Sequence, residues 1–218
     1  MCWSLESSLI MGSWGVIIGL YAIIRNASYR DRWQGAFILT FSLMQFPDAI
    51  LWYEQKTVGI AACTSTNKIL SKYVIHWILA AELIVAVIAP ALVDNFMKKS
   101  YYILNFLYAL GMMIPTQGCS TLTPQGHILW FGIEIRISLR VLFLIGIMWP
   151  CLFMKPFIAG LSYIAFISGV WLYSTLYTDA FGSNWCFSAT FCSILLLFDP
   201  FIFGRFFPEK KQKEKKEN

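Results

Sequence analysis

The chain has 218 residues, of which 58% are hydrophobic, 17% aromatic and 13% charged, and its formal net charge is +5. A soluble domain of this size usually carries about 25% charged residues, so the composition excludes an ordinary soluble globular protein. In lipid every backbone polar group needs a partner within the protein, which leaves helices or a closed barrel. The apolar stretches here are long and do not alternate as barrel strands do, so we predict an all-α integral membrane protein.

Seven apolar stretches are candidates for transmembrane helices, because a span needs about 20 apolar residues. In chain order they are Trp3–Ile24, Trp33–Tyr53, Tyr73–Val93, Tyr101–Pro115, His127–Trp149, Phe157–Tyr177 and Cys186–Phe203. The connections are short, so we expect one seven-helix membrane domain over residues 1–207. Residues 208–218 are mainly lysine and glutamate, which is typical of a disordered basic tail.

The positions of lysine and arginine predict the orientation of these helices, because positive residues of short loops stay in the cytosol. With the N-terminus outside, 12 of the 17 Lys and Arg lie on the inner side, 3 on the outer side and 2 within the fifth span. The outer three are Lys56, Lys68 and Lys72. We therefore expect an outside N-terminus and a cytosolic C-terminus. The one glycosylation sequon, at Asn26, would then face the cytosol and stay unmodified.

Four of the six cysteines fall at or beyond the outer ends of predicted spans, namely Cys2, Cys63, Cys119 and Cys186. Their position on the oxidising side favours two disulfides, although small apolar cysteines also pack at helix ends. Intervals of 61 and 67 residues suggest a 3+1+3 parallel repeat, in which spans one to three match spans five to seven. Four cysteines allow three pairings, and the repeat favours Cys2–Cys63 and Cys119–Cys186.

Ionisable residues within the predicted spans form a candidate polar core. A charged side chain at membrane depth costs about 2.5–3.5 kcal/mol on insertion scales, so it faces the bundle interior. A rise of about 1.5 Å per residue places Glu82, Glu134 and Arg136 near the midplane. Arg140 and Asp199 lie nearer the inner side. These depths favour the cross-helix pairs Glu82–Arg136 and Asp199–Arg140.

Gln45, Asp48 and His76 lie near the outer boundary, where we expect a polar vestibule open to the outside. Four acids in the spans outnumber two arginines, and carboxylates without a basic partner can relay protons across a membrane. This pattern favours a polar cavity or an ion path between the helices. The alternative is that the charged pairs only fix helix register.

Several other chemistries are not expected from this sequence. The last span has no lysine for a retinal Schiff base, and two histidines, His76 and His127, are too few for a membrane zinc hydrolase. No phosphate-binding glycine loop or catalytic grouping is present. We therefore expect no metal, no cofactor and no nucleic-acid partner, and the sequence favours a non-enzymatic role. Asp199-Pro200 with Phe203 resembles the D/N-P-x-x-Y segment of seven-helix receptors, but we favour a proline kink with a hydrogen-bonding Asp as its explanation.

The chain opens Met1-Cys2-Trp3-Ser4, and its second predicted span contains Met44-Gln45 and the stretch 48–52, Asp-Ala-Ile-Leu-Trp. With Cys63 in the next loop, these residues resemble an uncharacterised family of small multi-pass membrane proteins that begin MCWS, from bacteria, protists and large DNA viruses. The resemblance reaches to about Pro90 and implies architecture only. It also implies that Cys2 tethers the N-terminus.

The polar core predicts a small transporter or channel-like protein that moves a small solute, an ion or protons. Its partners would be the lipid bilayer and the transported species. The alternative is a seven-helix receptor or interaction protein that binds a cytosolic partner through its inner loops and basic tail.

Overall fold

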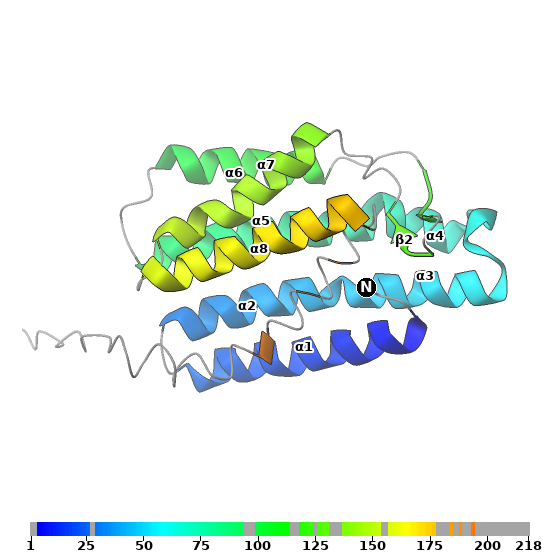
Figure 1. The fold of residues 1–218 in the computed structure, drawn as a ribbon, viewed down its shortest axis with the longest axis horizontal. Coiled ribbons are helices and arrows are strands. Elements are labelled where there is room, and N and C mark those ends of the chain that lie inside the picture. Colours follow the sequence, from blue (N-terminus) through cyan, green and yellow to red (C-terminus); the bar gives the residue numbers. More distant parts are fainter. Residues whose placement is uncertain are drawn as a thin grey trace, which may run out of the picture.

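The computed structural model describes residues 4–26, 29–93, 99–113, 118–123, 126–130, 137–153 and 157–177, with residues 184, 188, 193 and 194. This part of the chain is mostly helical (Figure 1). Its longer helices are α1 (Leu5–Arg25), α2 (Tyr29–Leu43), α3 (Gln45–Thr57), α5 (Ile75–Val93), α6 (Lys99–Met112), α7 (Ile137–Met148) and α8 (Phe157–Tyr177). The shorter elements are η1 (Ile60–Ala62), α4 (Ser65–Ile69), the π-helical turn η2 (Leu70–Val74), β1 (Thr121–Leu122), β2 (Ile128–Leu129) and η3 (Trp149–Phe153).

The long helices lie side by side and run up and down, so the bundle has two ends (Figure 1). One end holds the last turns of α3, the short helix α4 and the strands, and we call it the hairpin end. The opposite end holds the turn between α1 and α2 and the first turns of α6 and α8. Helix α5 contacts α2, α6 and α7, which makes it the central helix of the described bundle.

Three helical stretches among the described residues are long and apolar enough to cross a membrane. They are Leu5–Arg25 with 21 residues, Asp31–Thr57 with 27 and Ser65–Ala86 with 22. They overlap the first three predicted spans. The sixth predicted span is a helix with the predicted bounds, α8, and α6 lies within the fourth apart from its first two residues. The seventh predicted span and the basic tail lie almost wholly outside the described residues.

Capping side chains and one proline fix where the first helices begin and break. Ser4 accepts a hydrogen bond from the backbone N–H of Ser7, whose hydroxyl accepts from the backbone N–H of Ser4, so the two serines form a capping box at the start of α1. Asn26 closes α1 in the left-handed conformation at φ 43°. Pro47 lacks an N–H and cannot donate into the preceding turn, so the chain breaks at Met44 between α2 and α3.

The prediction of a helix starting at His127 is wrong. Strands β1 and β2 pair there as a short antiparallel hairpin, with Thr121 opposite Leu129, and α7 begins only at Ile137. Gly126 has φ 78° and donates a backbone hydrogen bond of 2.9 Å to the carbonyl of Thr123. A residue without a Cβ adopts this positive φ without strain, which favours a turn over a continued helix.

Helices α1 and α2 pack closely through small residues. A Cβ on Gly19 would lie 2.8 Å from the carbonyl oxygen of Gly35, and one on Gly35 would lie 2.6 Å from that of Gly19. Further along the same face, a Cβ on Gly12 would lie 2.9 Å from the Cβ of Gln45 in α3. Small residues of this kind let two helix backbones approach where lipid supplies no hydrophobic driving force.

Candidate functional site

Four residues of the predicted polar core have described side chains, and all four are buried. Gln45, Asp48 and Glu82 are 0% exposed and His76 is 4% exposed. The rest of the predicted polar core lies outside the described residues: Glu134, Arg136, Asp199 and the side chain of Arg140. The predicted pairs Glu82–Arg136 and Asp199–Arg140 therefore stay predictions.

Asp48 lies beneath the hairpin. The indole Nε1–H of Trp130 donates a hydrogen bond of 2.6 Å to Asp48 Oδ1, and Trp130 is itself only 4% exposed. This contact joins α3 to the residue that follows β2. The contact holds the hairpin against the first turn of α3.

Glu82 occupies the middle of the central helix. Ala80, Leu83 and Ala86 of α5 are also 0% exposed, so this part of α5 is buried within the bundle. A carboxyl group in such surroundings is costly to bury, and in a membrane helix it marks a functional position by default.

Two hydrogen bonds between side chains of α2 and the neighbouring helices hold the bundle together near Glu82 and toward the turn between α1 and α2. Trp33 Nε1–H donates 3.2 Å to the carbonyl of Val85, which joins α2 to α5. The amide of Gln34 donates to the hydroxyl of Tyr163 in α8. Each contact uses a polar side chain that faces another helix, which is how interhelical hydrogen bonds stabilise membrane bundles.

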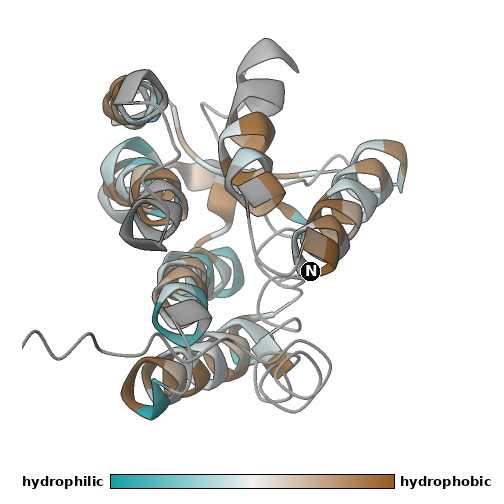
Figure 2. Ribbon diagram, turned by 90° about the vertical axis from the view of Figure 1, so that its left-hand side faces the viewer, coloured by the Kyte–Doolittle hydropathy of each residue, from teal (hydrophilic) through white to brown (hydrophobic). Residues whose placement is uncertain are grey.

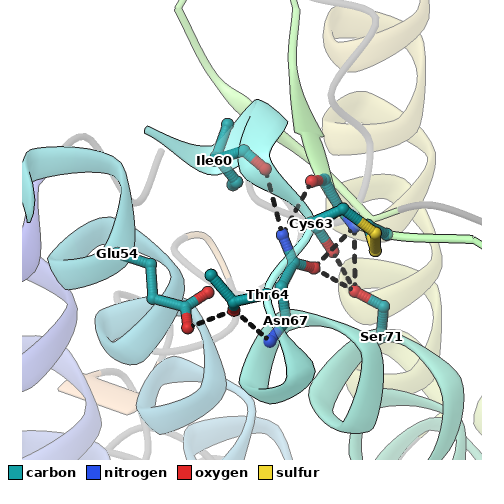
Figure 3. Close-up of a disulfide and its surroundings, with 8 residues drawn as sticks. Glu54, Ile60, Cys63, Thr64, Asn67 and Ser71 are labelled. Carbon is teal, nitrogen blue, oxygen red and sulfur yellow. Dashed lines mark hydrogen bonds between the residues drawn. A yellow bond between two sulfur atoms is a disulfide. The ribbon is translucent and has the colours of Figure 1, made fainter. Parts of the chain in front are cut away.

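A buried hydrogen-bond network organises the hairpin end (Figure 3). Asn67 is 0% exposed. Its Nδ2–H₂ donates to the carbonyls of Ile60 (3.3 Å) and Ser120 (3.1 Å). Its Oδ1 accepts from the hydroxyl of Ser71 and the backbone N–H of Ser120, both at 2.8 Å. One amide side chain thus joins η1, the π-helical turn and the segment before β1.

The π-helical turn explains how Ser71 reaches this network. Its hydroxyl lies 2.7 Å from that of Ser120 and accepts from the backbone N–H of Ser120 at 2.9 Å. A π-helical turn shifts the register of a helix by a fraction of a turn and occurs often at functional sites. Here it brings a small polar side chain of the Ser65–Ala86 stretch against Ser120.

A disulfide links Cys63 to Cys119 beside this network, with Cα atoms 5.6 Å apart (Figure 3). The predicted pairs Cys2–Cys63 and Cys119–Cys186 are therefore wrong. Both bonded cysteines lie at the hairpin end, as their predicted location required. The repeat misled the pairing because residues 118–123 fold back onto the loop that follows α3, which brings Cys119 to Cys63.

Sequence reasoning missed three residues that the structure brings together at this end. Trp130 was assigned to a helix, and Asn67 and Glu54 were not singled out. Glu54 is 9% exposed and accepts from the hydroxyl of Thr64, which also caps α4. The turn-forming composition around Gly118 and Gly126 was the available sign that a hairpin, and not a helix, follows α6.

Two ion pairs mark the two ends of the first helix. Arg25 contacts Asp31 at 2.7 Å across the α1–α2 turn, and Asp31 is 0% exposed. Lys56 contacts Glu6 at 2.8 Å at the hairpin end, where both side chains are more than half exposed. The buried pair fixes the α1–α2 turn, whereas an exposed pair contributes little stability.

The described residues contain no group of three or more His, Cys, Asp or Glu placed to hold a metal ion. His127 lies in the hairpin, and partial burial lowers the pKa of its imidazole. The neutral form is therefore favoured at pH 7, and its backbone pairs with Thr123 across the turn.

No protein-family model matches the chain, and searches of curated proteins and of solved structures return no similar protein.

Proposed function

We propose that the chain is an integral membrane protein that moves a small solute, an ion or protons through a polar core around Glu82. The observation that carries the proposal is a fully buried carboxyl group, 0% exposed, that lies near the middle of α5 and within the 22-residue stretch Ser65–Ala86, which is apolar enough to span a membrane. Such a residue is retained at membrane depth where it serves an ion or substrate path.

The outer surface of the bundle supports a lipid environment. On α1 the side chains of Ile10, Ile17 and Ile24 are 66%, 62% and 79% exposed, and on α8 Leu176 is 63% exposed. Figure 2 looks along the helices and shows hydrophobic residues on outward faces as well as between helices. Lipid would cover these side chains, whereas water would leave extended apolar patches exposed.

Seven spans are part of the proposal. Beyond the three stretches named above, α8 has 21 residues without a single charged side chain, and α6 and α7 run alongside α5. The apolar stretch Cys186–Phe203 would supply the seventh span. An odd number of spans places the two termini on opposite sides of the membrane.

The distribution of charge over the two ends supports an N-terminus outside. The hairpin end carries Lys56, Lys68 and Lys72, together with the disulfide. Disulfides persist on the oxidising side of a membrane, which would be the outside. The opposite end carries Arg25 and Arg32, and the basic tail would lie on the same side.

The test is a flux assay on purified protein in liposomes that contain a pH-sensitive dye, with imposed proton, Na⁺ and K⁺ gradients. We expect the wild type to dissipate at least one gradient. Glu82→Gln keeps the shape of the side chain and removes its charge, so it should slow that flux at least about 10-fold, because charge at this position is what the path needs.

The matched control is Glu6→Gln, the same substitution at a side chain that is 63% exposed in an ion pair with Lys56. Its flux should equal that of the wild type. If the wild type dissipates no gradient, or if Glu82→Gln and Glu6→Gln behave alike, the proposed function is wrong.

A further inference from the structure

The two arms of the hairpin are held in different ways. On the first arm, Cys119 is bonded covalently to Cys63, and the adjacent Ser120 is tied to Asn67 and Ser71 by hydrogen bonds of 2.7–3.1 Å. On the second arm, a side-chain hydrogen bond joins Trp130 to Asp48 of α3. The first arm is thus an anchor, and the second is held by non-covalent contacts.

The hairpin itself is a firm unit. Thr123 donates from its backbone to the carbonyl of His127 at 2.8 Å, and the backbone N–H of His127 donates to the hydroxyl of Thr123 at 3.1 Å. Together with the pairing of β1 with β2, these bonds hold the two arms together as one unit.

The second arm covers a buried carboxyl group. Ile128 and Trp130 are 1% and 4% exposed and belong to the same apolar cluster as Leu51 and Trp52 of α3. Asp48 of α3 contacts this arm through Trp130, is 0% exposed and lies one turn before Trp52. A tryptophan is suited to this place, because it buries a large apolar surface and still offers an N–H to the carboxylate.

We propose that the β1–β2 hairpin is the outer gate of the polar core, anchored at Cys119 and released at Trp130, so that its opening admits water and a small cation to Asp48. This inference rests on the proposed transport function, and it names the side and the residue at which the path opens. Asp48 is the group that the gate shields, and Glu82 lies deeper along the same bundle.

The test measures how far water-soluble reagent reaches each carboxyl group. Protein in lipid nanodiscs is treated with a water-soluble carbodiimide and an amine, and labelling is read peptide by peptide by mass spectrometry. In the wild type we expect strong labelling of Glu6 and very little of Asp48. Trp130→Phe removes only the indole N–H and part of the ring, and it should raise Asp48 labelling at least about 10-fold.

Two controls separate gate opening from general loosening. Trp33→Phe removes another indole hydrogen bond, the one from α2 to Val85, and should leave Asp48 as unreactive as in the wild type. Glu54, at the anchored side and 9% exposed, should stay unreactive in Trp130→Phe. Equal labelling of Asp48 in wild type and Trp130→Phe would overturn the gate, and so would a parallel rise at Glu54 or in Trp33→Phe.

A second variant keeps the proposal testable if Trp130→Phe does not fold. Asp48→Asn keeps an acceptor oxygen but weakens the bond to Trp130. It should speed hydrogen exchange of the peptide that contains Ile128 and Trp130 at least about 10-fold and leave the peptide that contains Ser120 unchanged. The gate would be contradicted if Asp48→Asn left the exchange rate of the peptide that contains Ile128 and Trp130 unchanged.

The two proposals fail separately. If Trp130→Phe exposes Asp48 but neither the wild type nor any variant carries flux, the hairpin covers Asp48 as inferred, but transport, and with it the role of the hairpin as a gate, is rejected. If Glu82→Gln abolishes flux while Trp130→Phe leaves Asp48 shielded, transport stands and the gate is rejected.

Discussion

Gly35→Ala is expected to destabilise the protein by about 2–3 kcal/mol, although alanine is the better helix former by about 1 kcal/mol. The added Cβ would lie 2.6 Å from the carbonyl oxygen of Gly19 and 2.8 Å from Cγ1 of Ile23. The first of these contacts is with backbone, so it cannot be relieved by a change of rotamer. The helices α1 and α2 must separate, and packing is lost along their whole interface.

Gly169→Ala is the matched control. Gly169 also lies inside a long helix, α8, but a Cβ there would meet nothing within 4 Å. The control should therefore be neutral or stabilise by up to about 1 kcal/mol. Unfolding in detergent, followed by circular dichroism, measures both. If the two variants unfold alike, the close α1–α2 approach is not a feature of the folded protein.

Asn67→Ala is expected to destabilise the hairpin end by about 2–4 kcal/mol. The substitution removes all four hydrogen bonds of the side chain and leaves the buried carbonyls of Ile60 and Ser120 without their side-chain donor. Buried acceptors without donors each cost about 1–3 kcal/mol. The loss should appear as a lower midpoint of unfolding and as faster hydrogen exchange in the peptide around Ser120.

Thr66→Ala serves as the control for Asn67→Ala, because Thr66 is exposed and lies next to Asn67 in the same short helix, α4. A surface substitution of this kind usually changes stability by less than about 0.5 kcal/mol. An Asn67→Ala protein as stable as Thr66→Ala would mean that the network does not hold the loop after α3 to the hairpin.

Features that depend on local composition could be predicted from the sequence. The apolar stretch Phe157–Tyr177 is a helix with the predicted bounds, and the first three predicted spans overlap the three stretches long enough to cross a membrane. Burial of Asp48 and Glu82 followed from the cost of exposing charge to lipid. These predictions needed only hydropathy and residue type over a window of about 20 residues.

Features that depend on contacts between distant segments could not be predicted. The pairing of Cys63 with Cys119 requires the chain after α6 to fold back over the loop after α3, and no local pattern specifies that path. The same fold-back brings Trp130 to Asp48 over a separation of 82 residues. The hydropathy of Ile128 and Leu129 suits a helix and a buried strand equally, so periodicity alone does not separate the two.

Labelling of lysines on sealed cells tests the central claim, a membrane-spanning bundle with the hairpin end outside, most directly. The cells are treated with a membrane-impermeant amine reagent before or after lysis, and labelling is read for each peptide. We expect Lys56, Lys68 and Lys72 to be labelled before lysis, and the lysines of the tail, residues 208–218, only after it. The account would be contradicted if the tail lysines were labelled before lysis as strongly as Lys56, Lys68 and Lys72, or more strongly.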